Sequence, residues 1–308
     1  MSNHKPDPSA NAICGSRIVK SGALLRSVFW LPAVSLSASL TLYACLQSAY
    51  AQDNQDEIPF KFTNFHFEVN ASACDWGPQI LFDTEGIVSG SVKDPNGHKV
   101  YIIRTDSGLK GIGGQTEGFL EAVEPVVQDL VEGGVDCEVD EEEPLVTLEE
   151  MRDWFPEGTY EFEGRSADGE VFDGSAELTY DIPAGPEILS PAEPANIGIN
   201  PAVALPIIWD TVTDSILPEL GPVNVVGYHV LVKDVTDGSA AMGPLAPHQF
   251  DVDVPGTETQ VDLPPAYLET ARVYEFEVLA TEVSGNQTIT EGGFFCTTGW
   301  TGDCEPPN

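Results

Sequence analysis

Positive charge is scarce in this 308-residue sequence. It has 13 lysines and arginines against 50 aspartates and glutamates, which gives a formal net charge of −37 at pH 7. A surface of this sign repels nucleic acid and anionic membranes, so the composition argues against binding to either. The acidic residues are spread along the chain rather than grouped at ligand spacing, as is typical of a surface adapted to a saline habitat.

Motifs for catalysis are also missing. The sequence has no His-x-His, His-Glu-x-x-His or Cys-x-x-Cys pair. The glycines of Gly111-Ile-Gly113-Gly114 lack the Lys-Ser/Thr of a phosphate loop, and Gly86-Ile-Val-Ser89-Gly90 is off register from the Gly-x-Ser-x-Gly elbow of hydrolases. We therefore predict that the protein is not an enzyme and uses no organic cofactor or transition metal.

The first 51 residues have the pattern of a secretory signal peptide. Four basic residues form a positive lead, an apolar run extends from Val28 to Leu46, and Ser48-Ala-Tyr-Ala51 offers a small-x-small cleavage site. The pattern predicts export, with cleavage after Ala51. The alternative is a lipoprotein signal, because Leu42-Tyr-Ala-Cys45 resembles a lipoprotein cleavage box in which Cys45 becomes the lipidated first residue. The lead is long for either signal, which leaves the true start codon open.

Removal of the leader changes the charge and the cysteine count. The leader takes 4 of the 13 basic and 1 of the 50 acidic residues, so 9 basic and 49 acidic residues remain, a net charge of −40. Four cysteines remain: Cys74, Cys137, Cys296 and Cys304. An even count in an exported chain indicates two disulfides, and proximity pairs Cys74 with Cys137 and Cys296 with Cys304. Thiolate binding of zinc is the alternative, but no histidine lies near these cysteines.

Proline divides the mature chain into two parts. Four prolines fall between Ile182 and Ala195, which predicts a stiff linker over 184–195. The predicted fold is all-β, with two tandem antiparallel immunoglobulin-like sandwiches at 57–183 and 196–298. A tail closed by a disulfide follows at 299–308, and the mature chain has no predicted transmembrane span.

The second part alternates in the manner of short strands. Val225–Val232, Gln249–Val254, Thr259–Leu263 and Arg272–Ala280 place apolar side chains at every second position, with Gly, Pro and Asp between them.

The strand residues of this part resemble a fibronectin type III module. The resemblance rests on Trp209 in the second strand, Gly227-Tyr228-His229-Val230 in the third, and Leu268 with Tyr274 at a corner. It implies that Trp209 is a core residue and that the Tyr274 hydroxyl bonds back to the chain near Leu268, as in a tyrosine corner. The Arg-Gly-Asp tripeptide of adhesive relatives is absent, so integrin binding is not implied.

The first part shows two hairpins and a helix. One hairpin turns at Asp94-Pro-Asn-Gly97, and the other joins Gly158–Gly164 to Ser175–Tyr180 across an Asp-Gly turn, a pattern that resembles the closing hairpin of bacterial immunoglobulin-like domains. Earlier in this part, Phe60, Phe62, Phe65 and Phe67 break phase by one residue, which predicts a bulged strand.

The helix is predicted near 147–155 as an insertion in the first sandwich. Thr147 and Glu150 form a capping box, and Pro156 ends the helix. Leu148, Met151 and Trp154 share a face, which predicts that Trp154 is buried.

Candidate ligands remain for the acidic loop and for one tryptophan. Asp136, Glu138, Asp140 and Glu141 lie within the glycine-rich and then acidic segment 107–145, for which we predict no fold and in which we look for function. Their oxygens suit Ca²⁺, although the spacing does not match the twelve-residue calcium loop. Trp300 lies inside the predicted Cys296–Cys304 loop, where it either stacks on a sugar or protein partner or packs on the adjacent sheet.

These patterns predict an exported, non-enzymatic binding or presentation module at a bacterial envelope or outside the cell, with a protein or glycan partner. The alternatives are a calcium-dependent adhesion or matrix module and an accessory module for polysaccharide binding. The carboxylate pairs of a glycoside hydrolase are not identifiable from sequence, because a chain with 49 acidic residues always offers some pair.

Overall fold

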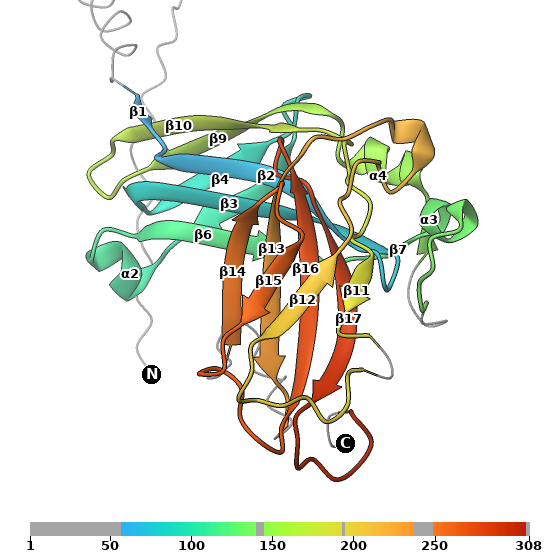
Figure 1. Cartoon of the computed structure of the whole chain (residues 1–308). Coiled ribbons are helices and arrows are strands. Elements are labelled where there is room, and N and C mark those ends of the chain that lie inside the picture. The colour runs from blue at the N-terminus through green and yellow to red at the C-terminus, as the bar shows by residue number, and fades with distance from the viewer. Residues whose placement is uncertain (1–56, 140–144, 193–194, 237–248, 306–308) are drawn as a thin grey trace, which may run out of the picture. The chain divides into compact units, whose positions relative to one another are not determined.

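The computed structural model describes residues 57–139, 145–192, 195–236 and 249–305. The predicted leader 1–51, including Cys45, lies outside the described residues. Strands dominate, so the protein is all-β (Figure 1). No helix among the described residues is long and apolar enough to cross a membrane.

The first half of the described chain carries ten strands and three helices. In chain order they are β1 (Ile58–Pro59), β2 (Phe62–Asn70), β3 (Asp75–Ile87), β4 (Ser89–Lys93), β5 (Lys99–Arg104), α2 (Ser107–Gly111), β6 (Gln115–Glu121), β7 (Val126–Val127), α3 (Gln128–Gly133), β8 (Leu145–Val146), α4 (Leu148–Trp154), β9 (Gly158–Arg165) and β10 (Val171–Leu178).

The second half is built from strands and a single turn of 3₁₀ helix. These elements are β11 (Ile188–Ser190), β12 (Leu205–Trp209), η1 (Pro218–Leu220), β13 (Val225–Asp234), β14 (Gln249–Pro255), β15 (Gln260–Leu263), β16 (Val273–Glu282) and β17 (Gln287–Cys296).

The first half folds as two sheets over one aromatic core. One sheet has the order β1-β10-β9-β4-β5, and the other contains β2, β3, β6, β7 and β8. Phe60 lies between them, with its ring edge-on to Phe82, Phe162 and Phe172 at centroid distances of 6.0 to 6.2 Å. Aromatic pairs of this geometry contribute beyond the area that they bury, so Phe60 fastens the two sheets together.

The phase break among the first phenylalanines is a change of sheet, and the predicted bulged strand is wrong. The Phe60 amide donates to Asp173 O in the first sheet, and the Lys61 amide donates to Asp83 O in the second, each at 2.9 Å. The chain therefore leaves β1 and enters β2 within one residue. A sheet change and a bulge leave the same one-residue shift in an alternating pattern, because both reverse the faces.

Segment 107–145 is more regular than its composition predicts. It contains α2, β6, β7 and α3, and β6 pairs with β3 from Gln79↔Glu121 onwards. The predicted helix near 147–155 is α4. Its capping box is complete, because Glu150 N donates to Thr147 Oγ1 at 3.2 Å and Thr147 N donates to Glu150 Oε2 at 2.9 Å.

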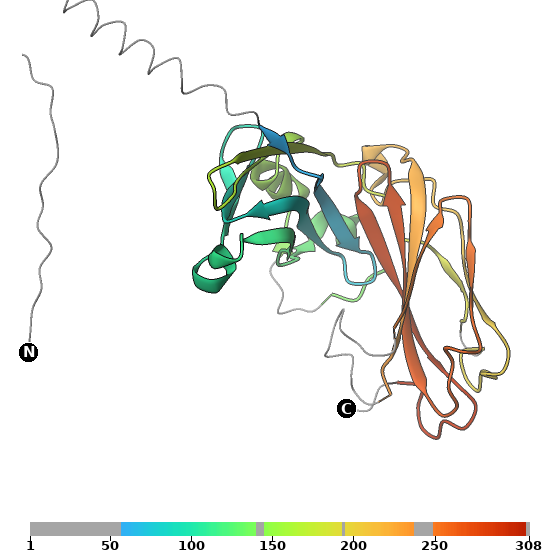
Figure 2. The ribbon, with the colours of Figure 1, turned by 90° about the vertical axis from the view of Figure 1, so that its left-hand side faces the viewer.

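The second half is a fibronectin type III-like sandwich. A three-stranded layer, β11-β12-β15, faces a four-stranded layer, β14-β13-β16-β17 (Figure 2). Trp209, Tyr228 and Phe276 are fully buried between the layers. The Glu269 amide donates to the Tyr274 hydroxyl at 2.8 Å, which is the corner that the resemblance implies.

The two sandwiches share a sheet, a feature of which the sequence gives no sign. Strand β17 of the second pairs in parallel with β2 of the first, from Gln287↔Glu68 to Ile289↔Asn70. The fully buried Asn286 strengthens this joint, since its Oδ1 accepts from Phe67 N at 2.8 Å and its Nδ2 donates to Thr179 O at 3.1 Å.

Both predicted disulfides are present. Cys74 is bonded to Cys137 and Cys296 to Cys304, each with a Cα–Cα distance of 5.7 Å. In the chain-entropy model the first is worth more, because it closes the longer loop. It fastens the end of segment 128–139 to the start of β3.

Candidate functional site

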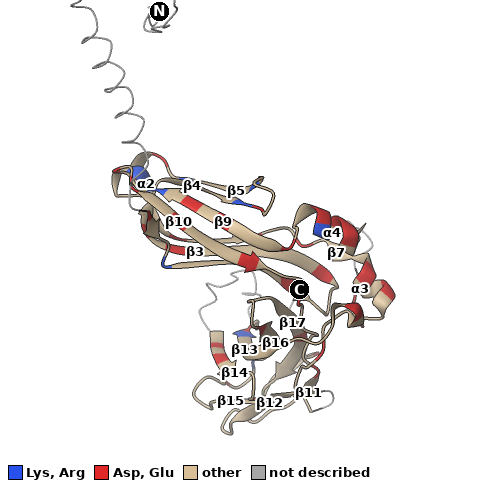
Figure 3. Cartoon of the chain, turned by 90° about the horizontal axis from the view of Figure 1, so that it is seen from above, with Lys and Arg blue, Asp and Glu red and all other residues tan. Residues whose placement is uncertain are grey.

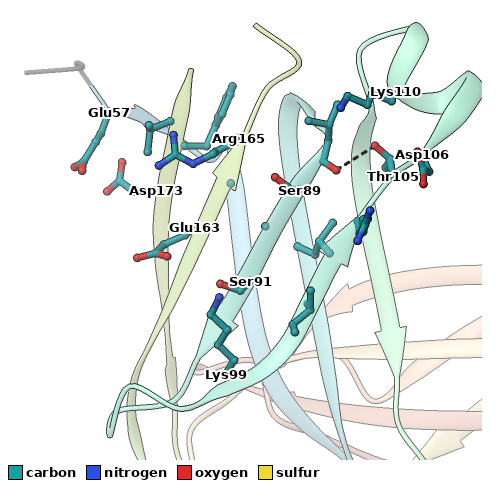
Figure 4. A pocket seen from close by; sticks show the side chains of 18 residues that line it. Glu57, Ser89, Ser91, Lys99, Thr105, Asp106, Lys110, Glu163, Arg165 and Asp173 are labelled. Atoms are coloured by element: carbon teal, nitrogen blue, oxygen red, sulfur yellow. Dashed lines mark hydrogen bonds between the residues drawn. The ribbon is translucent and has the colours of Figure 1, made fainter. Parts of the chain in front are cut away.

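A groove of about 700 Å³ runs along β4 on the outer face of the β1-β10-β9-β4-β5 sheet. Ser89 and Ser91 form its floor, because β4 carries small side chains between the longer ones of β9 and β5 (Figure 4). Gly90 between them faces the other way, and a Cβ there would lie 2.5 Å from Glu163 O, so glycine allows β4 and β9 to pair closely here.

Strand register arranges the groove in two rows. In the first row, Ser89 pairs with Arg165 on one side and with Arg104 on the other. In the second row, Ser91 pairs with Glu163 and Ile102. Residues that face each other across a sheet share one side of it, and rows two residues apart are about 7 Å apart. A cationic row therefore runs beside a row that carries a carboxylate.

The groove holds an unusual share of the positive charge of the chain. Nine lysines and arginines follow residue 51, and all nine are among the described residues. Four of the nine line the groove: Lys99, Arg104, Lys110 and Arg165. Figure 3 shows blue ribbon at α2 and at β5.

The groove cations differ from the others in their partners. Lys61, Lys93, Lys233 and Arg272 are in ion pairs, and Arg152 lies 5.1 Å from the ring centroid of Tyr180. None of the four groove cations makes an ion pair of 4.0 Å or less with another described residue. On so acidic a surface partners are abundant, so the charge of these four remains available to a ligand.

Carboxylates also line the groove, but two of them are engaged. Glu163 bonds Lys93 outside the groove, and this hydrogen bond raises the pKa of Lys93. Asp106 accepts from Ser107 N at 2.9 Å and caps α2. Glu57 and Asp173 lie on the side of Arg165, as Figure 4 shows.

The structure describes two of the four predicted calcium residues. Asp136 and Glu138 are exposed on either side of Cys137, while Asp140 and Glu141 lie outside the described residues. The structure brings together a group of three other carboxylates where β2 of the first sandwich pairs with β17 of the second. Oxygens of Glu68, Glu121 and Glu124 lie within 4.8 Å of one another, the spacing at which carboxylates could share a cation.

Burial raises the pKa values of two of these three carboxylates. Burial, with Glu121 nearby, raises the pKa of Glu68 to about 7, although its hydrogen bond with Gln287 opposes the shift. Burial and the neighbouring carboxylates raise the pKa of Glu124 to about 8. Glu68 and Glu124 are therefore both partly protonated near pH 7.

A second hollow, of about 400 Å³, has an apolar lining that includes Trp76, Val123, Met151 and Trp154. The prediction that Trp154 is buried is wrong, because 52% of it is exposed. Helix α4 buries Leu148 and Met151. The next inward side chain on that face is Phe155, just after the helix, which packs edge-on against Phe67. Trp154 is therefore left at the rim of the hollow.

The remaining sequence candidates have structural partners. Trp300 donates to Asp303 O at 2.8 Å and packs beside Val235 and Val273. His229 contacts Asp251 at 3.2 Å and Asp253 at 2.8 Å. His66 is buried, and burial lowers its pKa to about 4, so it is neutral near pH 7.

No family model and no curated protein sequence matches the chain. Among solved structures, it is similar to the chicken CNTN1 FN1–FN3 domains at 11% identity, with 79% of this chain and 68% of that chain covered and a TM-score of 0.31. It is also similar to a 1.5-MDa bacterial ice-binding adhesin at 11% identity, with 80% of this chain and 66% of that chain covered and a TM-score of 0.25. The fibronectin type III domain of human collagen α-1(XX) is 15% identical, with 41% of this chain and 89% of that domain covered and a TM-score of 0.24. Likenesses at this level carry nothing about function.

The side chains of the groove offer hydrogen-bond donors that suit anionic oxygens. Guanidinium groups offer paired donors to carboxylate, sulfate or phosphate oxygens, and the serines add hydroxyls. Sequence reasoning missed the groove because its residues come from four strands and a helix. The one available signal was that Lys99, Arg104 and Lys110 lie close together in a sequence that has only nine basic residues after residue 51.

Proposed function

We propose that the protein is an exported, non-enzymatic binding module that acts at the bacterial envelope or outside the cell, and that the groove along β4 is its binding surface. The observation that carries this proposal is the set of four groove cations without ion pairs among the described residues. A ligand that supplies an anionic group gains hydrogen bonds to charged donors, each of which contributes about 1.5–3 kcal/mol.

Export is supported by the signal pattern of residues 1–51 and by the two disulfides, which form and persist in oxidising compartments. A binding rather than catalytic role is supported by the groove lining. Acid–base or nucleophilic chemistry would require a base within hydrogen-bond reach of a nucleophile. No such pair is formed by Ser89 or Ser91 with any described residue.

The experiment compares retention of the mature chain, residues 52–308, on beads that carry carboxylate, sulfate or phosphate groups and on uncharged beads. We expect retention on at least one anionic surface, loss of it in Arg104→Gln/Arg165→Gln, and no loss in Arg152→Gln, a matched exposed arginine outside the groove. The proposal is wrong if no anionic surface retains the protein, or if the groove variant and the control behave alike.

A further inference from the structure

We propose that the ligand of the β4 groove is a carboxylated polysaccharide, a chain of hydroxyl-rich sugars that carry carboxylate groups. This inference rests on the proposed function of the groove and names the chemical class that its two rows recognise. Four features of the lining select this class: the spacing of the two arginines, the carboxylates in the adjacent row, the serine floor and one exposed apolar wall residue.

The first row suits a single carboxylate. Arg104 and Arg165 are both exposed and flank Ser89 from neighbouring strands on the same face. Adjacent strands lie about 4.8 Å apart, so the two arginine Cα atoms are about 10 Å from each other across the serine. An anionic group above Ser89 is within reach of both guanidinium groups. Lys110, from α2, adds charge at this end of the groove.

The second row disfavours a second anion at its β10 end. Glu163 pairs directly with Asp173 on β10, and Lys93 compensates the charge of Glu163. Asp173 makes no ion pair of 4.0 Å or less with a described residue, so it would repel a further carboxylate of the ligand. Hydroxyl groups are accepted instead, because ionised carboxylates act only as hydrogen-bond acceptors and bind O–H donors well.

The distance between the rows favours the binding of a glycan over that of an acidic peptide. An extended peptide presents side chains to one face about every 7 Å, which matches the row spacing. A run of acidic residues that places one carboxylate at Arg104 and Arg165 therefore places the next at Glu163 and Asp173. A polymer of sugar acids avoids this clash, because the twist of the chain turns successive carboxylates to different sides and leaves hydroxyl groups of the bound ring facing the second row.

The wall opposite Glu163 completes the match. Ile102 on β5 is 66% exposed, which is high for an isoleucine in the middle of a strand. Sugar rings have an apolar C–H face beside their polar edge, and contact with Ile102 removes both surfaces from water. Ser91 lies between Ile102 and Glu163 and offers a hydroxyl that both donates and accepts.

The test titrates mature 52–308 with three polymers at about 0.15 M NaCl. Polygalacturonate carries carboxylates and hydroxyls, its fully methyl-esterified form keeps the hydroxyls without the charge, and poly-L-glutamate keeps the charge without the sugar. We expect polygalacturonate to bind best. Arg104→Gln/Arg165→Gln should lower its affinity by about tenfold or more, and Arg152→Gln should leave it unchanged.

Asp173→Ala supplies the decisive arm. Asp173 is exposed and its removal makes the groove more positive. Affinity for polygalacturonate should fall several-fold with the lost acceptor, whereas a purely electrostatic ligand should bind more tightly. Tighter binding of polygalacturonate to this variant overturns the inference.

Three further results bear on the two proposals separately. Equal binding of the ester and the acid overturns the carboxylate requirement, and with it the named ligand class. Binding of poly-L-glutamate without polygalacturonate overturns the glycan but keeps the groove as a binding surface. No binding of either charged polymer, together with no retention on any anionic beads, overturns the proposed function as well.

Discussion

Arg104 and Arg165 lie on opposite sides of Ser89, in one row across β5, β4 and β9, and neither is in an ion pair with a described residue. This arrangement creates a cationic spot on a chain of strongly negative net charge. The net charge of the chain and the local charge of the groove act differently on an anionic ligand. Distant carboxylates repel it over the screening length of the solution, while the groove attracts it at contact.

The affinity for polygalacturonate should therefore pass through a maximum as salt rises. At about 0.01 M salt the Debye length is about 30 Å and the whole surface repels the polymer, whereas at about 0.15 M it is about 8 Å and the groove dominates. Above this the groove contacts themselves are screened. Calorimetric titration over a NaCl series tests the prediction, and a steady decline from the lowest salt would show that the global charge has no part.

The pH dependence of stability should report the carboxylate group at the joint. Glu68 and Glu124 have pKa values of about 7 and about 8, above those of an unfolded chain, so the native state holds more protons between about pH 4.5 and pH 8. These protons stabilise the fold at low pH, and this stabilisation is lost as pH rises through 7 and 8. Buried His66 acts in the opposite sense below about pH 6.5, because its folded pKa of about 4 is depressed.

Glu68→Gln separates these contributions. Its free energy of unfolding should fall less steeply than that of the wild type from pH 6.5 to pH 8.5, with a gain on the order of 1–3 kcal/mol at the alkaline end. The groups that face Glu68 are Gln79, Gln287, Glu121, Glu124 and Glu277. Urea unfolding at each pH measures the slope, with exposed Glu149→Gln as the control. Parallel curves for Glu68→Gln and the wild type would show that Glu68 does not titrate in this range.

The tyrosine corner should be energetically significant. Tyr274→Phe removes the acceptor of the Glu269 amide, and such a loss costs about 1–3 kcal/mol when the donor is left unsatisfied. Thermal unfolding of Tyr101→Phe serves as the control, because the Tyr101 hydroxyl has no hydrogen bond with a described residue. Equal melting temperatures for the two variants would mean that the corner contributes nothing.

Two neighbours on α4 should respond differently to truncation. Met151 is 1% exposed, and Met151→Ala should cost about 2–5 kcal/mol through the lost burial and the cavity left behind. Trp154 is 52% exposed, so Trp154→Ala should cost less than about 1 kcal/mol. Denaturant unfolding of both variants makes the comparison, and a loss in Trp154→Ala as large as that in Met151→Ala would contradict this difference between the two side chains.

Local patterns predict much of this fold. Thr147 and Glu150 predict the start of α4 because a capping box is complete within four residues. Alternation from Tyr228 to Val232 and from Tyr274 to Ala280 predicts the faces of β13 and β16, since period two places every second side chain in the core. The four cysteines pair by proximity as expected.

Long-range pairing is what local patterns do not carry. The contact of Gln287 with Glu68 joins strands from opposite ends of the described residues, and no motif at either position predicts it. The groove also depends on long-range pairing. Arg165 and Arg104 lie in one row only because β4 pairs with both β9 and β5. Trp154 was misplaced for a local reason, as a two-turn helix has room for few inward positions.

The side-chain NMR signals of the four arginines in residues 52–308 test the central claim most directly. Arg104, Arg152, Arg165 and Arg272 can be assigned by single substitutions, and their Nε–Hε cross-peaks can be followed by NMR during titration with a galacturonate oligomer. We predict that the signals of Arg104 and Arg165 shift together along one saturable curve, while those of Arg152 and Arg272 stay in place. Shifts at Arg152 or Arg272 without a change at Arg104 and Arg165 would place the ligand elsewhere and contradict the account.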